Sequence, residues 1–201
     1  MRVRGNMRTR KPTPADLPAL ASLLSSNECL CVLGRAQGQP ELVTMGEAYV
    51  ANVLRTEYAS FDNCMARYAS PASRLWVLVD DDDAVVGSVG VLEDSEQCGH
   101  FELVRMYMHA SYRRRGYGRV LLAELFDHAR RHEGTQVALT TPSANAPGLA
   151  FYRRVGFRRA RAFEITESFG VDQGPQHTLE LTEMCMGLAA TEPEAEAGGL
   201  E

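Results

Sequence analysis

Residues 101–141 constrain the fold most, because they read as a strand, a short turn, a long helix and a second strand. Period-two alternation over 101–109 puts Arg105 on one strand face and Glu102 on the other, together with the apolar side chains at 104, 106 and 108. Residues 117–132 carry a helical apolar stripe, formed by Leu121, Leu122, Leu125, Phe126 and Ala129. Gly134 suits the end of this helix, and 137–141 form the next strand. The order predicts a protein that combines helices with a sheet.

A hairpin precedes this stretch. Residues 74–79 and 84–92 read as two antiparallel strands, and the aspartates at 80–83 as the turn between them. These aspartates lack the alternating spacing and the distal glutamate of an EF-hand, so a calcium loop is not expected. Further strands are expected at 7–11, 160–166 and 178–186.

Helices are expected in the first third of the chain and after residue 145. Asp16 is expected to cap a helix whose leucines at 17, 20, 23 and 24 recur at helical spacing. The glycines and proline within 27–43 predict a loop, followed by a second helix to about residue 58. Asn145 opens a short helix that Gly156 ends.

Length and composition favour one domain. The chain has 201 residues, of which 45% are hydrophobic, which is enough for a sizeable core. We expect a domain over residues 7–188, preceded by a flexible head at 1–6. The tail at 189–201 is acidic and has too little apolar surface to fold, so we expect it to be disordered.

Charge and cysteine usage exclude several classes of partner. A formal net charge of -5 argues against a nucleic-acid binder, which concentrates positive charge. No apolar signal segment follows the N-terminus, and the apolar stretch at 85–92 is far shorter than the ~20 residues of a membrane helix. The five cysteines are irregularly spaced and offer no second pair for zinc. We therefore expect a cytoplasmic protein that binds no membrane, no nucleic acid and no metal.

The turn at residues 113–118 carries the clearest chemistry. It joins a strand directly to a helix, so its backbone N–H groups point outward at the positive end of the helix dipole. Its glycines let the backbone approach a ligand closely, and its arginines add charge for phosphate oxygens. We predict a pyrophosphate site built from Arg113, Arg114, Arg115, Gly116, Tyr117, Gly118 and Arg119.

This turn matches the R-x-x-G-x-G signature of the GNAT N-acetyltransferases. Residues 102–108 look like the fourth strand of that family, and 145–157 resemble its N-x-x-A-x-x-x-Y-x-x-x-G-F block, with Gly148 where alanine is usual. The resemblance covers residues 7–188 in order of elements, but its specific part lies in 101–157. It implies an α/β (α+β) fold with a mixed, largely antiparallel twisted sheet of six to seven strands. About four helices flank that sheet, which is splayed between its fourth and fifth strands.

The resemblance also implies acetyl-CoA as the co-substrate. In the family, the pantetheine arm enters the gap between the splayed strands and pairs with the fourth strand like an added strand. The corresponding positions are Met106, Tyr107 and Met108, where a backbone N–H can polarise the thioester carbonyl. Asn145 either bonds to the cofactor arm or caps its helix, and the two roles are compatible.

Two catalytic residues follow from the same resemblance. Tyr152 stands where the family tyrosine lies close to the CoA sulfur, and it is the candidate acid for the departing thiolate. Glu102 precedes Arg113 by eleven positions, the offset of the general base in histone-acetylating members. Burial among apolar side chains is expected to raise the pKa of Glu102, and deprotonation relayed by water is the alternative.

We expect an enzyme that transfers an acetyl group to a primary amine of a small molecule or amino acid derivative, by direct attack in a ternary complex. A protein lysine or N-terminal acetyltransferase is the enzyme alternative, and it needs an open groove between 27–60 and the last hairpin. A non-catalytic acyl-CoA-binding module is the third interpretation. The expected state is a monomer or a homodimer.

Overall fold

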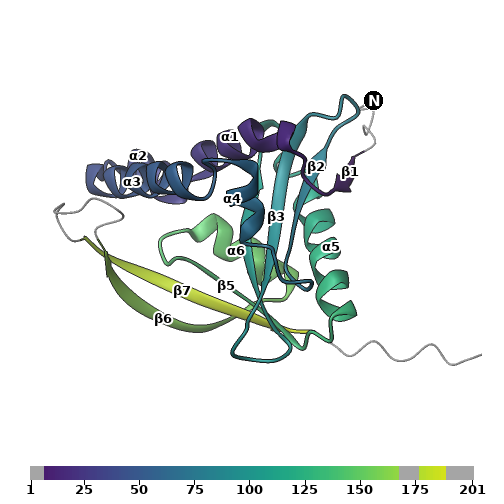
Figure 1. The fold of residues 1–201 in the computed structure, drawn as a ribbon. Coiled ribbons are helices and arrows are strands. Elements are labelled where there is room, and N and C mark those ends of the chain that lie inside the picture. Colours follow the sequence, from purple (N-terminus) through teal and green to yellow (C-terminus); the bar gives the residue numbers. More distant parts are fainter. Residues whose placement is uncertain (1–6, 168–176, 189–201) are drawn as a thin grey trace, which may run out of the picture.

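The computed structural model describes residues 7–167 and 177–188, so the expectations for 1–6 and 189–201 lie outside the described residues. Its sheet has seven strands in the order β1-β2-β3-β4-β5-β7-β6 (Figure 1). The strands are β1 (Arg8–Arg10), β2 (Arg74–Val79), β3 (Val85–Glu93), β4 (His100–Met108), β5 (Gln136–Pro142), β6 (Arg158–Glu167) and β7 (His177–Gly187). All neighbours pair antiparallel except β4 and β5, which are parallel. The predicted mixed, largely antiparallel sheet is confirmed.

Helices cover both faces of the sheet. They are α1 (Leu17–Asn27), α2 (Cys29–Gln37), α3 (Pro40–Thr56), α4 (Phe61–Ala66), α5 (Tyr117–Arg131) and α6 (Ala146–Val155), with 3-10 turns η1 (Pro14–Asp16) and η2 (Ala110–Tyr112). Strand β2 shows the arrangement, because Trp76 and Leu78 pack with α5, whereas Val77 and Val79 pack with α1 and α3. Burial on both faces accounts for its continuous apolar sequence.

Strands β4 and β5 separate after a short contact. Their parallel pairing is confined to three register positions, from His100 opposite Gln136 to Glu102 opposite Ala138. Strand β5 then stays with β7 along its whole length, while β4 stays with β3. The C-terminal part of β4 therefore has no β5 partner, and the predicted splay is confirmed.

A β-bulge at Arg105 overturns the predicted faces of β4. Arg105 has φ of 51°, and the register with β3 shifts at this point. The extra residue turns the following side chains over, so Met106 joins the core beneath α5 while Tyr107 faces α1 and α3. Glu102 consequently does not share a face with Met106 and Met108, as strict alternation had predicted. The buried hydroxyl of Ser88 donates to the Arg105 carbonyl at 2.9 Å and holds the bulge.

The segment predicted as a loop over 27–43 is largely helical. Gly34 and Gly46 act here as contact points between two helices, because a Cβ on Gly34 would lie 2.7 Å from Val43 and one on Gly46 would lie 2.6 Å from the Cys31 sulfur. Only glycine allows α2 and α3 to approach so closely, and Gly38 makes the turn between them at φ of 67°. With α2 and the short α4, the described residues form six α-helices instead of about four.

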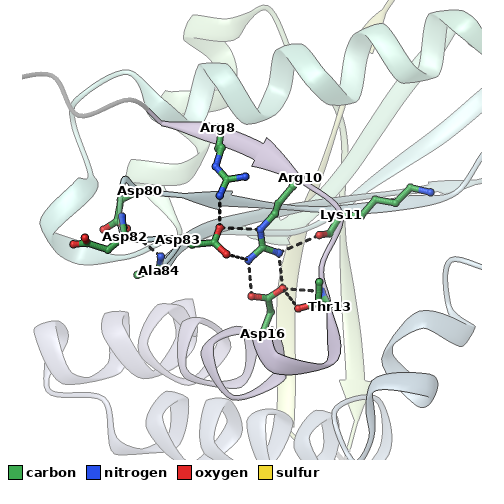
Figure 2. A network of polar contacts seen from close by, with 9 residues as sticks. All are labelled: Arg8, Arg10, Lys11, Thr13, Asp16, Asp80, Asp82, Asp83 and Ala84. Carbon is green, nitrogen blue, oxygen red and sulfur yellow. Dashed lines mark hydrogen bonds and ion pairs between the residues drawn. The ribbon is translucent and has the colours of Figure 1, made fainter.

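A polar network holds β1 against the first helical turn and the β2–β3 turn (Figure 2). Arg10 donates to both carboxylate oxygens of Asp16, at 2.6 and 2.9 Å, and also contacts Asp83. Asp16 accepts from the Thr13 amide at 2.7 Å and makes no capping bond to α1, so the predicted cap is wrong. Asp83 also binds Arg8, which gives the acidic turn its structural role.

The first two helices form a long apolar segment. By length and composition, Pro14–Gln37 would be sufficient to cross one, a test that the core helices of other proteins also pass. In the structure, the segment is broken at Glu28, whose ψ of 114° is not helical. Leu20 and Leu24 have no exposed surface, because they pack against the sheet.

Candidate functional site

The turn between β4 and α5 presents a run of free backbone amides. Arg114 and Gly116 have positive φ of 62° and 90°, which turns the chain sharply before α5 begins at Tyr117. Among the described residues, no oxygen accepts a hydrogen bond from the amides of Arg114 through Gly118. Such amides at a helix N-terminus bind phosphate oxygens, so the geometry fits a pyrophosphate.

The side chains around this turn divide into two groups. Arg114, Arg115 and Arg119 are exposed and can meet phosphate oxygens. Arg113, in contrast, donates from Nε to the Met108 carbonyl at 3.0 Å and from Nη2 to Asn27 Oδ1 at 2.7 Å. Its guanidinium thus connects the end of β4 to the end of α1.

Gly118 and Tyr117 shape the start of α5. A Cβ on Gly118 would lie 3.1 Å from the Phe151 ring and 3.4 Å from the Met106 methyl group. Glycine therefore lets the first turn of α5 lie against both α6 and β4. Tyr117 is half-buried and packs against the core beneath α5.

Backbone N–H groups from the C-terminal part of β4 point into the gap between β4 and β5. His109 N–H donates to the Val86 carbonyl on β3 at 2.8 Å. Because successive N–H groups alternate along a strand, those of Met108 and Met106 point away from β3 and into the gap, while that of Tyr107 points toward β3. Met108 N–H has a long contact of 3.4 Å with Asn27 Oδ1, so Met106 offers the less engaged donor.

Asn145 performs the predicted capping role. Its Oδ1 accepts from the Gly148 amide at 3.2 Å at the start of α6, and its Nδ2 donates to Thr141 Oγ1 at 3.0 Å. The glycine at 148 follows from this cap, since a Cβ there would lie 2.4 Å from Asn145 Nδ2. A contact of Asn145 with the cofactor stays a prediction.

Tyr152 lies on α6, half-buried, with its ring 5.7 Å from that of Phe157. Burial raises the pKa of its phenol, and the nearby Cys29 adds to the shift. The hydroxyl therefore stays protonated at neutral pH, as a proton donor requires. The Tyr152 hydroxyl has no hydrogen-bond partner among the described residues, and it is not completely buried.

Glu102 is exposed, so the prediction of a buried Glu102 is wrong. It lines a cavity of about 470 Å³ with residues 92–97, at the end of β3 and in the following loop, and with Thr140 and Glu183. The cavity walls still displace water and raise the pKa of Glu102, although Arg67 and Arg105 act in the opposite direction. Glu102 lies at the paired end of β4, four residues from Met106, or roughly 13 Å along an extended strand.

Sequence reasoning missed a polar cluster on the face of β4 that α1 and α3 cover. Arg105 donates to both carboxylate oxygens of Glu57 and, at 2.7 Å, to the Tyr49 hydroxyl. Asn27 accepts from Arg113 at 2.7 Å as well as from Met108. A charged residue inside the apolar run at 103–108 was the one available signal for Arg105.

Within residues 7–167 and 177–188, no group of three or more metal-ligating side chains comes together.

Comparisons with known proteins agree with this geometry. The Acetyltransferase (GNAT) family profile matches residues 44–157, which is more than half of the chain. No curated protein matches the sequence significantly.

Solved structures share the fold at low sequence identity. A GNAT acetyltransferase from Staphylococcus aureus Mu50 has a TM-score of 0.63 at 14% identity, covering 91% of this chain and 99% of that one. The yncA protein of Salmonella typhimurium, solved with its cofactor acetyl-CoA, has a TM-score of 0.60 at 21% identity, covering 94% and 98%. The ribosomal-protein-S18-alanine N-acetyltransferase of Escherichia coli has a TM-score of 0.57 at 14% identity, covering 94% and 98%. The chain is an acetyltransferase that belongs to the GNAT family.

Proposed function

We propose that this protein transfers the acetyl group of acetyl-CoA to a primary amine of a small molecule or amino acid derivative, by direct attack in a ternary complex. The free amides of Arg114 through Gly118 carry this proposal, because they suit a diphosphate at the mouth of the gap beside β4. Acetyl-CoA, when bound there, supplies an activated thioester.

The residues around the gap suit the two halves of the transfer. Met106 N–H points into the gap and can stabilise the negative charge that develops on the thioester carbonyl oxygen. Tyr152 can donate its phenol proton as the C–S bond breaks. Glu102 can accept a proton from the amine, but its place at the paired end of β4 requires water molecules as a relay.

Packing of α2 and α3 against the last hairpin supports a small acceptor. Leu30 and Met45, on α2 and α3, pack against Leu179 on β7. Ile165 on β6 joins the same contact. A peptide would have to pass between 27–60 and the last hairpin, which is where these side chains meet. We therefore favour a small amine over a protein lysine or N-terminus.

The test combines purified protein, acetyl-CoA and two acceptor panels, one of small primary amines and one of peptides. Mass spectrometry identifies acetylated products, and a thiol reagent follows the release of CoA. Acetylated small amines support the proposal, whereas products from the peptide panel alone would favour the protein acetyltransferase. Tight binding of acetyl-CoA without amine-dependent thiol release would indicate a non-catalytic module and contradict the proposal.

A further inference from the structure

Glu28, at the turn between α1 and α2, is a buried carboxylate without a cationic partner. It is 6% exposed, and its Oε1 accepts from the Leu30 amide at 3.1 Å and from the Cys29 thiol at 3.6 Å. In the described parts of the chain, no arginine, lysine or histidine lies within ion-pair distance of it. Buried carboxylates are normally paired, so this one lacks a partner that a ligand can supply.

Two arginines close to this turn are committed to other groups. Arg105 binds Glu57 through two nitrogens and Tyr49 through the third, and its charge reaches Glu28 only through space. Arg113 is held by the Met108 carbonyl and by Asn27. Neither is free to neutralise Glu28.

The turn that carries Glu28 lies beside the gap. Asn27, the preceding residue, contacts the Met108 amide at the end of β4. Cys29, the following residue, is close enough to Tyr152 on α6 to influence its pKa. Glu28 likewise influences the pKa of Tyr107 on β4. The turn that carries Glu28 therefore adjoins the end of β4, which we assign to the thioester.

Helix capping alone does not explain a glutamate at this position. Serine, threonine and asparagine are among the preferred N-caps, and each could bind the Leu30 amide without burying a charge. Desolvation raises the pKa of Glu28, while its bonds to Leu30 and Cys29 and the charge of Arg105 act in the opposite direction. The charge of Glu28 contributes in turn to the raised pKa values of Tyr107 and Cys31. A carboxylate in such surroundings is a competent proton acceptor.

We propose that Glu28 receives the ammonium group of the acceptor and takes its proton, so that the enzyme selects cationic primary amines. This inference rests on the proposed acetyl transfer. One proton passes from the ammonium to Glu28, and the neutral nitrogen forms a bond to the thioester carbon. The C–S bond then breaks as Tyr152 donates its phenol proton to the sulfur, and the second nitrogen proton passes through water to the Tyr152 phenolate. Glu28 finally releases its proton to water.

The experiment measures acetylation of butylamine, phenethylamine and phenylalaninamide by the full chain across pH 6 to 10. The key variant is Glu28→Gln, which keeps an oxygen for the Leu30 amide and removes the charge. Glu102→Gln tests the other carboxylate, and Glu47→Gln is a matched control at an exposed glutamate. Calorimetry of acetyl-CoA binding and thermal unfolding verify that each variant is intact.

Glu28→Gln should lower kcat/KM for the amine by about 100-fold or more and leave acetyl-CoA affinity unchanged. Its rate should rise with pH toward the pKa of the free amine, because the bound ammonium no longer has an acceptor. If the wild type acetylates amines and Glu28→Gln has the same kinetics as Glu47→Gln, the Glu28 proposal is overturned and the proposed function stays intact. Acetyl-CoA binding without acetylation of any amine by the wild type would overturn the proposed function, and this inference with it.

Discussion

The buried ion pair between Arg105 and Glu57 gives a prediction whose size follows from burial. Both side chains are 9% exposed, so replacing Arg105 by methionine leaves a buried carboxylate whose remaining cationic partner, among the described residues, is the more exposed Arg67. Loss of one member of such a pair costs about 3–5 kcal/mol. Methionine is also a non-glycine residue at the same positive φ, so the backbone strain is unchanged.

Urea denaturation followed by circular dichroism measures this cost. Arg105→Met, Glu57→Gln and the double variant form a double-mutant cycle, in which we expect a coupling energy of about 2 kcal/mol. Arg67→Met is the control, and it should cost about 1 kcal/mol or less because Arg67 is more exposed. Additive single effects, or an Arg105→Met cost as small as that of the control, would refute the reasoning.

Three further predictions concern the site and the first strand. Gly118→Glu should weaken acetyl-CoA binding, measured by calorimetry, at least ~100-fold, because it places bulk and negative charge at the proposed phosphate site. Gly118→Ala should have a smaller effect, which comes from contact with Phe151. Tyr152→Phe should lower kcat about 10- to 100-fold with little change in acetyl-CoA affinity, and equal kcat would contradict its role as an acid. Hydrogen bonds from Arg10 lower the pKa of Asp16, so the stability that this carboxylate contributes is present at neutral pH and is lost as pH falls below the ordinary aspartate range. Asp16→Asn should therefore lower the free energy of unfolding by about 2 kcal/mol at pH 7 and remove that part of the acid sensitivity. Urea denaturation at several pH values measures both effects.

The sequence was informative where local pattern and structure coincide. The apolar stripe of α5, the turn before it and the Asn145 cap are all encoded within a few residues, and each was predicted. The strands were found to within two residues because alternation and turn residues mark them. The run of free amides could be predicted for the same reason, since it comes from one continuous segment, and its binding of phosphate stays a prediction.

The remainder depends on contacts between distant segments. Gly34 looks like a helix breaker in the sequence, and only the approach of α3 shows why glycine is needed within α2. The bulge at Arg105 cannot be read from alternation, because it arises where Ser88 and Glu57 hold that residue from other elements. Glu28 looks like an ordinary helix-end residue until Asn27 is seen bound to the end of β4.

The most direct test of the phosphate site is an amide NMR titration of the ¹⁵N-labelled protein with acetyl-CoA. The amides of Arg114 through Gly118 should show the largest shifts, together with that of Met106 in the gap. Desulfo-CoA, which keeps the pyrophosphate, should reproduce the shifts at the turn. Acetyl-CoA binding that leaves the amides of 114–118 unchanged would contradict the assignment of this turn as the phosphate site.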